Sequence, residues 1–268
     1  MGSTRTRHEH DENRRDFYRR CIDVLQEAGV PFLVGGACAI ELYTGVSRPT
    51  KDFDVFVRRE SMDGALEAFE RAGYRAELTF PHWLGKAFSG DDYIDVIYSS
   101  GNGLATVDDE WFQWAREAEV LDREVRLTPP EEAIWSKAFI MERERYDGAD
   151  VAHIIESMGE ELDWRRLVRR FGSHWRVLAS HLTLFGYIYP SRRDAVPAWV
   201  MRTMCERLAG EVNDEPPAVE VCRGTVLSRA QYLTDVERGR LLDGRLAPFG
   251  AMTEEQVEDW TAAMDEER

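Results

Sequence analysis

The stretch Thr50-Lys51-Asp52-Phe53-Asp54-Val55-Phe56-Val57 is the most informative segment of this 268-residue chain. Acidic residues are uncommon in β-strands, yet two of them lie here inside an apolar run that is typical of a strand. Side chains alternate between the two faces of a strand, so Asp52 and Asp54 share one face while the apolar side chains share the other. The apolar face can enter a core, and cations or protons must then relieve the repulsion between the two carboxylates.

A third acid, Asp95, lies in a second alternating run, residues 93–98 (Tyr-Ile-Asp-Val-Ile-Tyr). A lone polar residue on the solvent face of an edge strand is the alternative interpretation. Mg²⁺ takes one or two protein carboxylates and fills its remaining positions with water and phosphate oxygens. We therefore expect Asp52 and Asp54 to bind Mg²⁺ and Asp95 to complete the set of acids.

Two glycines, Gly35 and Gly36, come fifteen residues before this acidic strand. Residues 30–34 (Val-Pro-Phe-Leu-Val) predict a short buried strand and residues 37–43 predict a helix, with the glycines at the junction. A backbone without Cβ can approach a ligand closely and point its N–H groups at phosphate. An ordinary tight turn is the alternative, but the acidic strand that follows favours a phosphate-binding turn.

These residues together resemble the motif set of the DNA polymerase beta-type nucleotidyltransferase superfamily, carried here by Gly35-Gly36, Asp52-Phe53-Asp54 and Asp95. Residues 48–54 (Arg-Pro-Thr-Lys-Asp-Phe-Asp) are similar in particular to its compact members, which include aminoglycoside nucleotidyltransferases and the nucleotidyltransferase toxins of abortive-infection systems. The resemblance covers about residues 15–155. The spacing between the glycines and the acids is slightly long, and the second small residue is Gly where Ser is frequent.

The resemblance implies transfer of a nucleoside monophosphate from a nucleoside triphosphate, with ATP favoured, to an acceptor hydroxyl, with release of pyrophosphate. Positioning and charge neutralisation do most of the work in such a reaction. Asp52, Asp54 and Asp95 would hold two Mg²⁺ ions, and the second ion would lower the pKa of the acceptor hydroxyl. Asp95 can also accept the proton, while Gly35 and Gly36 would cradle the β- and γ-phosphates.

Basic residues for the triphosphate follow from the same resemblance. Toxin-like relatives carry a lysine on the first helix after the core, followed by an Arg-rich stretch and an Asp. Lys137, Arg145, Asp147 and Asp150 match that order. The alternatives are a solvated helix residue for Lys137 and acids at a helix N-terminus for Asp147 and Asp150.

Other polar residues lie close to these motifs in the sequence. Arg48 can contact phosphate, and Thr50 shares the face of the aspartates and can orient them. His82 can serve as a base or acceptor contact and Lys86 as a phosphate contact, although a histidine beside a tryptophan is commonly structural. The sequence assigns no role to residues 228–232.

Strands alternate with helices up to about residue 127, and helices follow. This order predicts an α+β protein in which a nucleotidyltransferase-type mixed β-sheet flanked by helices precedes a helical C-terminal half. We expect a disordered tail at residues 1–12, a nucleotidyltransferase α/β core at 13–127 and a helical domain at 128–268. The predicted elements are helices over 16–28, 61–72, 131–145, 163–170, 174–187 and 196–209, strands over 74–79, 84–89 and 93–98, and a linker over 210–219.

The charge of the chain bears on its partners. Its 50 acidic and 34 basic residues give a formal net charge of −16, which argues against extended nucleic acid as a ligand because phosphate contacts need a basic surface. A small, cationic acceptor fits this charge better. The Arg-rich segment 164–170 has two interpretations, a local basic groove or the solvent-exposed face of an amphipathic helix. We expect no membrane partner and a cytoplasmic location, because no apolar run or signal peptide is evident and the four cysteines are scattered.

Two other functions remain open at this point. One is a nucleotide-binding regulatory module without turnover, although the presence of all three acids argues against it. The other is a toxin-type nucleotidyltransferase that acts on tRNA or protein and is paired with a protein antitoxin. A purely structural helical protein would leave the Asp-Phe-Asp strand unexplained.

Overall fold

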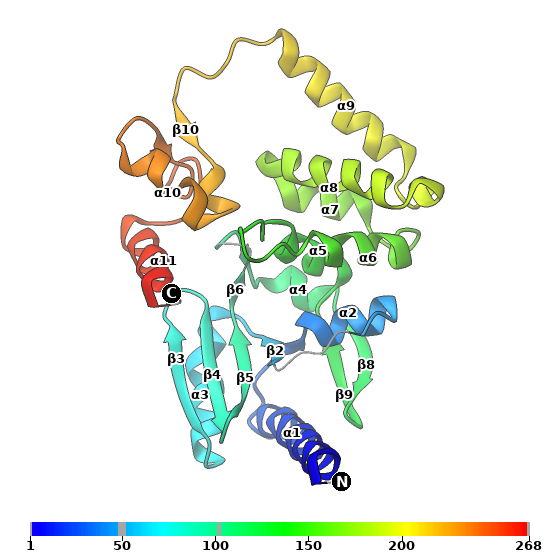
Figure 1. The fold of residues 1–268 in the computed structure, drawn as a ribbon, viewed down its shortest axis with the longest axis vertical. Coiled ribbons are helices and arrows are strands. Elements are labelled where there is room, and N and C mark those ends of the chain that lie inside the picture. Colours follow the sequence, from blue (N-terminus) through cyan, green and yellow to red (C-terminus); the bar gives the residue numbers. More distant parts are fainter. Residues whose placement is uncertain (1, 48–51, 101–102, 267–268) are drawn as a thin grey trace. The chain divides into compact units, whose positions relative to one another are not determined.

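The computed structural model describes residues 2–47, 52–100 and 103–266 (Figure 1). Arg48 and Thr50, which the sequence predicts to contact the nucleotide and to orient the aspartates, lie outside the described residues. The chain forms two compact units. The first comprises Met1–Glu41, Ser47–Ser99 and Thr106–Pro129, and the second comprises Leu42–Val46, Ser100–Ala105 and Pro130–Arg268.

A seven-stranded mixed sheet organises the first unit, in the order β3-β4-β5-β2-β1-β9-β8. Strand β2 runs parallel to β5 and antiparallel to β1, and β1 runs parallel to β9. The predicted α+β fold with a mixed sheet is therefore confirmed. The strands are β1 (Leu33–Val34), β2 (Asp52–Phe56), β3 (Arg75–Phe80), β4 (Leu84–Ser89), β5 (Asp92–Ile97), β8 (Arg116–Val120) and β9 (Arg123–Leu127).

Apolar side chains on one face of this sheet form the core beneath the acids. Phe53 is buried, as are Ile94 and Val96 of the neighbouring β5. Tyr18 of α1 stacks on Phe53 with their ring centroids 5.1 Å apart, and α3 packs on β3 and β4. The helices of this part of the chain are α1 (Gly2–Glu27), α2 (Gly36–Thr44), α3 (Met62–Arg71), α4 (Asp109–Gln113) and the 3₁₀ turn η1 (Arg59–Ser61).

Helix α1 corrects the prediction of a disordered tail at residues 1–12, because it begins at Gly2. No glycine or proline interrupts residues 3–28. Once the apolar part of α1 is packed, extending the helix adds one hydrogen bond for each residue fixed, so the polar segment continues it. The helix ends as predicted before Gly29, whose N–H donates to Gln26 at 3.0 Å with φ at 65°.

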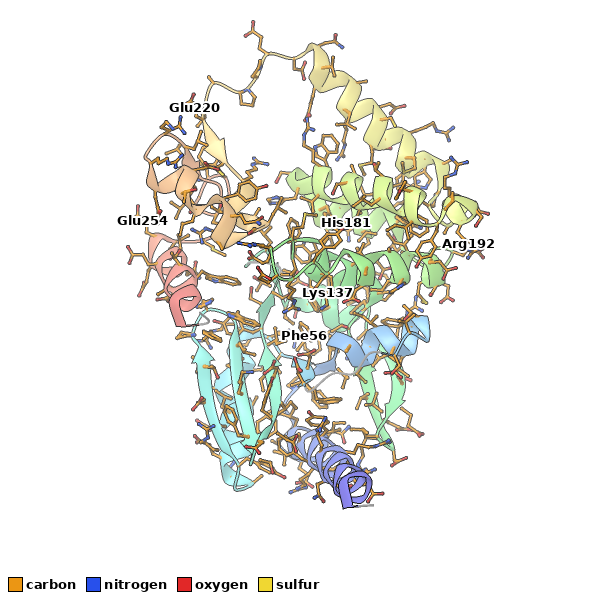
Figure 2. The ribbon with its side chains drawn as sticks, in the orientation of Figure 1. Phe56, Lys137, His181, Arg192, Glu220 and Glu254 are labelled. Atoms are coloured by element: carbon orange, nitrogen blue, oxygen red, sulfur yellow. The ribbon has the colours of Figure 1, made fainter. Side chains whose placement is uncertain are left out.

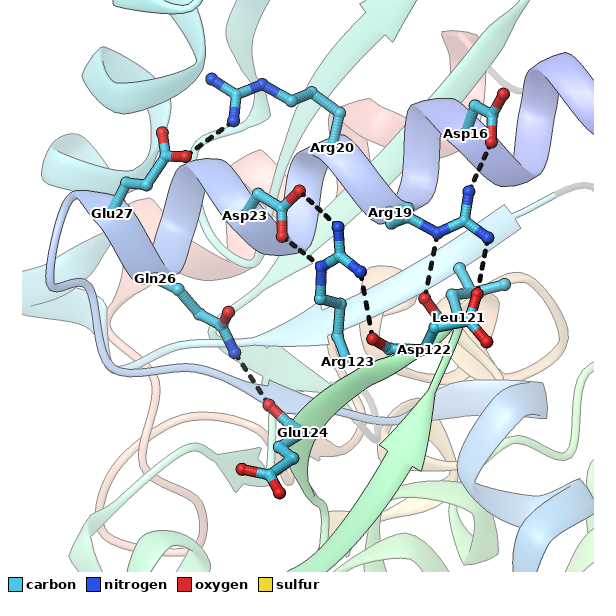
Figure 3. Close-up of polar contacts among 10 residues, drawn as sticks. All are labelled: Asp16, Arg19, Arg20, Asp23, Gln26, Glu27, Leu121, Asp122, Arg123 and Glu124. Atoms are coloured by element: carbon cyan, nitrogen blue, oxygen red, sulfur yellow. Dashed lines mark hydrogen bonds and ion pairs between the residues drawn. The ribbon is translucent and has the colours of Figure 1, made fainter.

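The hairpin of β8 and β9 was not predicted, and α1 is bound to it (Figure 3). Its two-residue loop, Leu121 and Asp122, has positive φ at both positions, which matches the right-handed twist of the strands. Arg19 of α1 donates to the carbonyl oxygen of Leu121 at 3.1 Å and pairs with Asp122 at 2.9 Å. Arg123 binds Asp23 with both nitrogens of one edge, so these contacts fix the helix against the sheet edge.

The second unit is mainly helical. Its helices are α5 (Pro130–Ala138), α6 (Gly148–Met158), α7 (Trp164–Phe171), α8 (Trp175–Ile188), α9 (Ala198–Asn213), α10 (Arg229–Glu237) and α11 (Glu254–Glu266), with 3₁₀ turns η2 (Gly172–His174), η3 (Pro190–Ala195) and η4 (Gly224–Val226). Short strands β10 (Val221–Cys222) and β11 (Leu242–Asp243) pair in parallel, and β6 (Ser99–Ser100) pairs with β7 (Ala105–Thr106). No helix in the described part of the chain is both long enough and apolar enough to cross a membrane.

Two predicted boundaries in this unit are wrong. The helix expected over 131–145 ends at Ala138, because the backbone N–H of Met141 donates to Leu227 at 3.1 Å and that of Asp147 donates to Ile140. Those groups are satisfied outside a helix, so the chain can leave it. The linker expected over 210–219 begins only after Asn213, where α9 ends.

Candidate active site

The three predicted acids lie on one face of the sheet. Parallel pairing places Asp54 of β2 directly beside Asp95 of β5, and Asp52 beside Tyr93. Side chains of paired residues point to the same side of a sheet, so the carboxylates of Asp52, Asp54 and Asp95 share the face opposite the apolar core. Asp95 is only 8% exposed, while the two acids of β2 are half-buried.

The glycine turn packs directly against β2. The N–H of Gly35 donates to the carbonyl oxygen of Asp54 at 3.0 Å. Gly36 has φ at 54°, and a Cβ at this position would overlap Oδ2 of Asp54. A Cβ on Gly35 would likewise overlap the ring of Phe56. Both positions therefore require glycine, which explains why serine is absent from the second one.

Lys86 of β4 binds the most buried of the three acids. Its Nζ donates to Oδ1 of Asp95 at 2.7 Å and lies 3.9 Å from the ring centroid of Tyr93. Burial raises the pKa of Asp95, the Lys86 ammonium opposes that rise, and the Asp52 carboxylate adds to it. The structure therefore pairs Lys86 with a predicted metal ligand.

The donor set fits Mg²⁺ chemically. Carboxylate oxygens are the hard donors that this ion takes, and a rigid strand presents two of them on one face. The missing Cβ of Gly36 gives backbone and carboxylate a close approach that any other residue would block. Among the described residues, no group of three or more His, Cys, Asp and Glu side chains is gathered as a metal cluster, and Asp95 is paired with the Lys86 ammonium instead.

In the second unit, the structure brings together four polar residues that the sequence predicts as a set, Lys137, Arg145, Asp147 and Asp150. Figure 2 labels the side chain of Lys137, which lies on α5. Its Nζ lies 2.8 Å from Oδ2 of Asp147 and 3.5 Å from Oδ2 of Asp150. Arg145 donates to both oxygens of Asp147, at 3.1 and 2.9 Å. Lys137 therefore pairs with two buried acids, which differs from a solvated helix residue.

Asp147 directly precedes α6 and Asp150 lies in its first turn, so the alternative of acids at a helix N-terminus stays open for both. The side chain of Asp147 makes no capping hydrogen bond and instead accepts from Lys137 and Arg145. Burial would raise the pKa of its carboxyl, but Arg145 and Lys137 outweigh burial and lower the pKa below its ordinary value. The carboxylate is therefore ionised and serves as an anchor for the two cations.

His181 of α8 lies in the same unit and was missed by sequence analysis. Its Nε2 is 2.9 Å from the carbonyl oxygen of Ala138 at the end of α5, and its ring stacks on Tyr146 at an interplanar angle of 11°. Burial lowers the pKa of His181, opposed by this hydrogen bond, so the ring is neutral. No local motif marks this residue, because its partners are distant in the sequence.

The structure also locates His82 and the segment 228–232. His82 is buried in the turn between β3 and β4, with its ring centroid 6.1 Å from that of Phe80, and its role stays a prediction. Ser228 caps α10 through the N–H of Gln231 and donates to Oε2 of Glu142 at 2.6 Å. Residues 228–232 therefore include a structural contact to the loop after α5.

A mixed sheet that carries a strand–glycine turn–helix unit beside three acids on adjacent strands defines a nucleotidyltransferase. The chain belongs to the family described as nucleotidyl transferase of unknown function (DUF2204), whose model matches residues 14–173. It is therefore an enzyme of the transferase class. No curated protein matches the chain.

Several solved structures are similar to this chain at low identity. An antigenic nucleotidyltransferase-like protein from Paracoccidioides brasiliensis is 15% identical, with 66% of this chain and 90% of that chain covered and a TM-score of 0.44. The antibiotic-resistance factor ANT(2'')-Ia is 19% identical over 75% of this chain and 96% of its own, with a TM-score of 0.39. The lincosamide antibiotic adenylyltransferase LnuA is 15% identical over 52% and 94%, with a TM-score of 0.38.

Proposed function

We propose that this enzyme transfers a nucleoside monophosphate from a nucleoside triphosphate, with ATP favoured, to a hydroxyl of a small-molecule acceptor in a Mg²⁺-dependent reaction. The observation that carries the proposal is the parallel register that sets Asp54 beside Asp95, with Asp52 two residues away on the same face. Three rigidly mounted carboxylates beside a glycine turn are what a metal-bound triphosphate requires.

Each acid has a role in the proposed transfer. Asp52 and Asp54 would bind two Mg²⁺ ions, and Asp95 would be a further ligand of the second ion. When bound, Mg²⁺ neutralises the phosphate oxygens and makes the acceptor hydroxyl more acidic. Asp95 would take the hydroxyl proton as the acceptor oxygen bonds to the α-phosphorus. The bond from the α-phosphorus to the bridging oxygen breaks, and pyrophosphate leaves with that electron pair.

The remaining residues would bind the triphosphate. The N–H groups at Gly35 and Gly36 would face the β- and γ-phosphates, as backbone at a helix start does in other phosphate sites. Contact of Lys137 with phosphate stays a prediction. The contacts of this lysine with Asp147 and Asp150 support that prediction, since a lysine held by two buried acids keeps its charge and direction.

The charge of the chain supports a small acceptor. A net charge of −16 disfavours long nucleic acid and favours cationic molecules by simple attraction. The four cysteines are free, which supports a reducing compartment such as the cytoplasm.

Pyrophosphate release tests the proposal. Wild type would be assayed with a panel of triphosphates and Mg²⁺, with small-molecule, tRNA and protein pools as acceptors, against Asp52→Asn and Asp95→Asn. Asp92→Asn is the matched control, because Asp92 lies on β5 but faces away from the acids and pairs with Arg14 at 3.0 Å. We expect release that needs Asp52 and Asp95 but not Asp92, and near-wild-type turnover in both site variants would overturn the proposal.

The acceptor pool that supports release distinguishes the related functions. Release with the small-molecule pool alone supports the proposal as stated. Release with tRNA or protein, together with growth arrest that Asp54→Ala relieves, would replace it with the toxin-type reaction and a protein antitoxin as partner. Tight binding of Mg-ATP without release in any pool would replace it with the regulatory nucleotide-binding module.

A further inference from the structure

Charged residues form a straight row across four neighbouring strands. Glu77 on β3 pairs in register with Lys86 on β4, Lys86 pairs with Asp95 on β5, and Asp95 pairs with Asp54 on β2. The four strands lie side by side in the sheet (Figure 1). Paired residues share a face, so this row continues the acidic pair of the proposed site toward the sheet edge.

Lys86 is held in place from more than one direction. Its ammonium donates to Oδ1 of Asp95 at 2.7 Å and lies 3.9 Å from the ring centroid of Tyr93 on the same strand. The side chains of Lys86 and Asp95 are mostly buried. An ammonium over an aromatic ring gains a cation–π attraction that strengthens when water is excluded. The lysine therefore has one defined position.

This contact determines how Asp95 is presented. A carboxylate on a free side chain can rotate, and rotation would move both oxygens relative to Asp54. The hydrogen bond from Lys86 occupies Oδ1, so the direction of Oδ2 is fixed as well. Partners that orient a metal ligand in this way affect metal binding strongly, although they do not touch the ion.

We infer that Lys86 is a positioning residue for Asp95, which orients this carboxylate for a divalent cation shared with Asp54. The inference rests on the proposed function for the identity of the cation site. It differs from the expectation that Lys86 contacts phosphate, because the lysine here is engaged by the carboxylate itself.

Direct metal binding tests this role without turnover. Mn²⁺ affinity of the nucleotide-free full chain would be measured by calorimetry and by Mn²⁺ electron paramagnetic resonance, for wild type, Lys86→Met and Lys86→Arg. We expect Lys86→Met to weaken Mn²⁺ binding about 10- to 100-fold and Lys86→Arg to recover much of the loss. Arg75→Met is the matched control, because Arg75 lies on the same sheet face but contacts Glu77 and the ring of Phe88.

The outcomes separate positioning from the other roles of a lysine. Unchanged Mn²⁺ affinity in Lys86→Met, with a higher KM for the triphosphate, would assign phosphate contact and overturn the inference. Unchanged affinity with a lower melting temperature would assign packing only, and tighter Mn²⁺ binding would show that the lysine competes with the ion. Either of these two results would also overturn the inference that Lys86 positions Asp95.

Failure of the proposed function gives a different pattern. If wild type releases no pyrophosphate but Lys86→Met still weakens Mn²⁺ binding, the positioning role stands and the proposed reaction falls. If wild type turns over and Lys86→Met binds Mn²⁺ as tightly as wild type, the reaction stands and the positioning role falls.

Discussion

Replacing Gly36 with alanine tests whether the glycine turn positions the acid on β2. Gly36 opens α2 with φ at 54°. An added Cβ would overlap Oδ2 of Asp54 and would lie 2.6 Å from its Cγ and 2.9 Å from its Cβ. Carbon atoms in contact are about 3.5–4.0 Å apart, so the carboxyl group must retreat by about 1 Å or rotate.

The expected cost has two parts. A residue with a Cβ in the left-handed region loses about 1 kcal/mol relative to glycine. Forcing Asp54 away from its preferred rotamer adds about 1 kcal/mol, for a total loss of about 2 kcal/mol in the free energy of unfolding. Such a loss lowers the melting temperature by about 4–8 °C in a domain of this size. Moving one reacting group by about 1 Å costs about 100-fold in rate.

Gly29 supplies a control with the same backbone strain. Its φ is 65°, and an added Cβ there would meet no atom within 4 Å. Gly29→Ala should therefore lose about 1 kcal/mol and keep the kcat of wild type. Thermal melting, followed by pyrophosphate release at a temperature where both variants are folded, separates the strain from the displacement of Asp54.

The comparison between the two variants decides the outcome. We expect Gly36→Ala to be less stable than Gly29→Ala and about 100-fold slower. If Gly36→Ala matches Gly29→Ala in both melting temperature and kcat, the turn does not position Asp54 and the argument from its close approach is refuted.

Two predictions concern the second unit. Arg166→Met should cost about 3 kcal/mol in unfolding free energy, because Arg166 is 3% exposed and its removal takes the cation from buried Glu131 and leaves Arg170 as the cation on buried Glu132. Urea denaturation measures the free energy of unfolding, and a loss under about 1 kcal/mol would contradict the prediction for Arg166. Burial holds the pKa of His181 below 6.5, with the hydrogen bond to Ala138 opposing. Folding favours the neutral ring, so its stabilisation is complete above about pH 6.5 and is lost as pH falls toward the folded-state pKa. Urea denaturation at about pH 7.5 and 5.5 should show that the free energy of unfolding falls more for wild type than for His181→Gln. An equal fall in the two proteins would contradict this role of His181.

The sequence was sufficient for the strands that carry the acids. Alternation in residues 52–56 and 92–97 has the period of a strand, and burial of Phe53 and Ile94 on the opposite face confirms which side chains enter the core. The glycine turn was equally visible, because a strand and a helix flank it. These signals are local, so they need no knowledge of the remaining fold.

The hairpin of β8 and β9 was missed for a different reason. Its strands alternate charged residues with Ala118, Val120, Val125 and Leu127, which is the period of a strand, but its loop is Leu121-Asp122 where Asn-Gly is the usual signature. Contacts far apart in the sequence stabilise it, including the parallel pairing of Val34 with Leu127. Its presence therefore depends on the assembled sheet.

The basic segment after α6 also differs in part from its prediction, because of contacts between residues far apart in the sequence. The arginines of residues 164–170 predict the wet face of an amphipathic helix, yet Arg166 is buried between two glutamates of α5. A sequence contains both charges but not the contact between them. The same limitation hid the early end of α5, which depends on a hydrogen bond from Met141 to Leu227.

Register is the property that turns these local patterns into a site. The alternation of β5 tells only that Asp95 faces away from Ile94 and Val96; it does not tell which residue of β2 lies beside it. A slip of one residue would bring those two apolar side chains to the acidic face and bury Asp95 in the core. Because Ile94 and Val96 are fully buried, the core itself selects the register in which Asp95 meets both Asp54 and Lys86. The free energy that folds the sheet thus also positions the carboxylates.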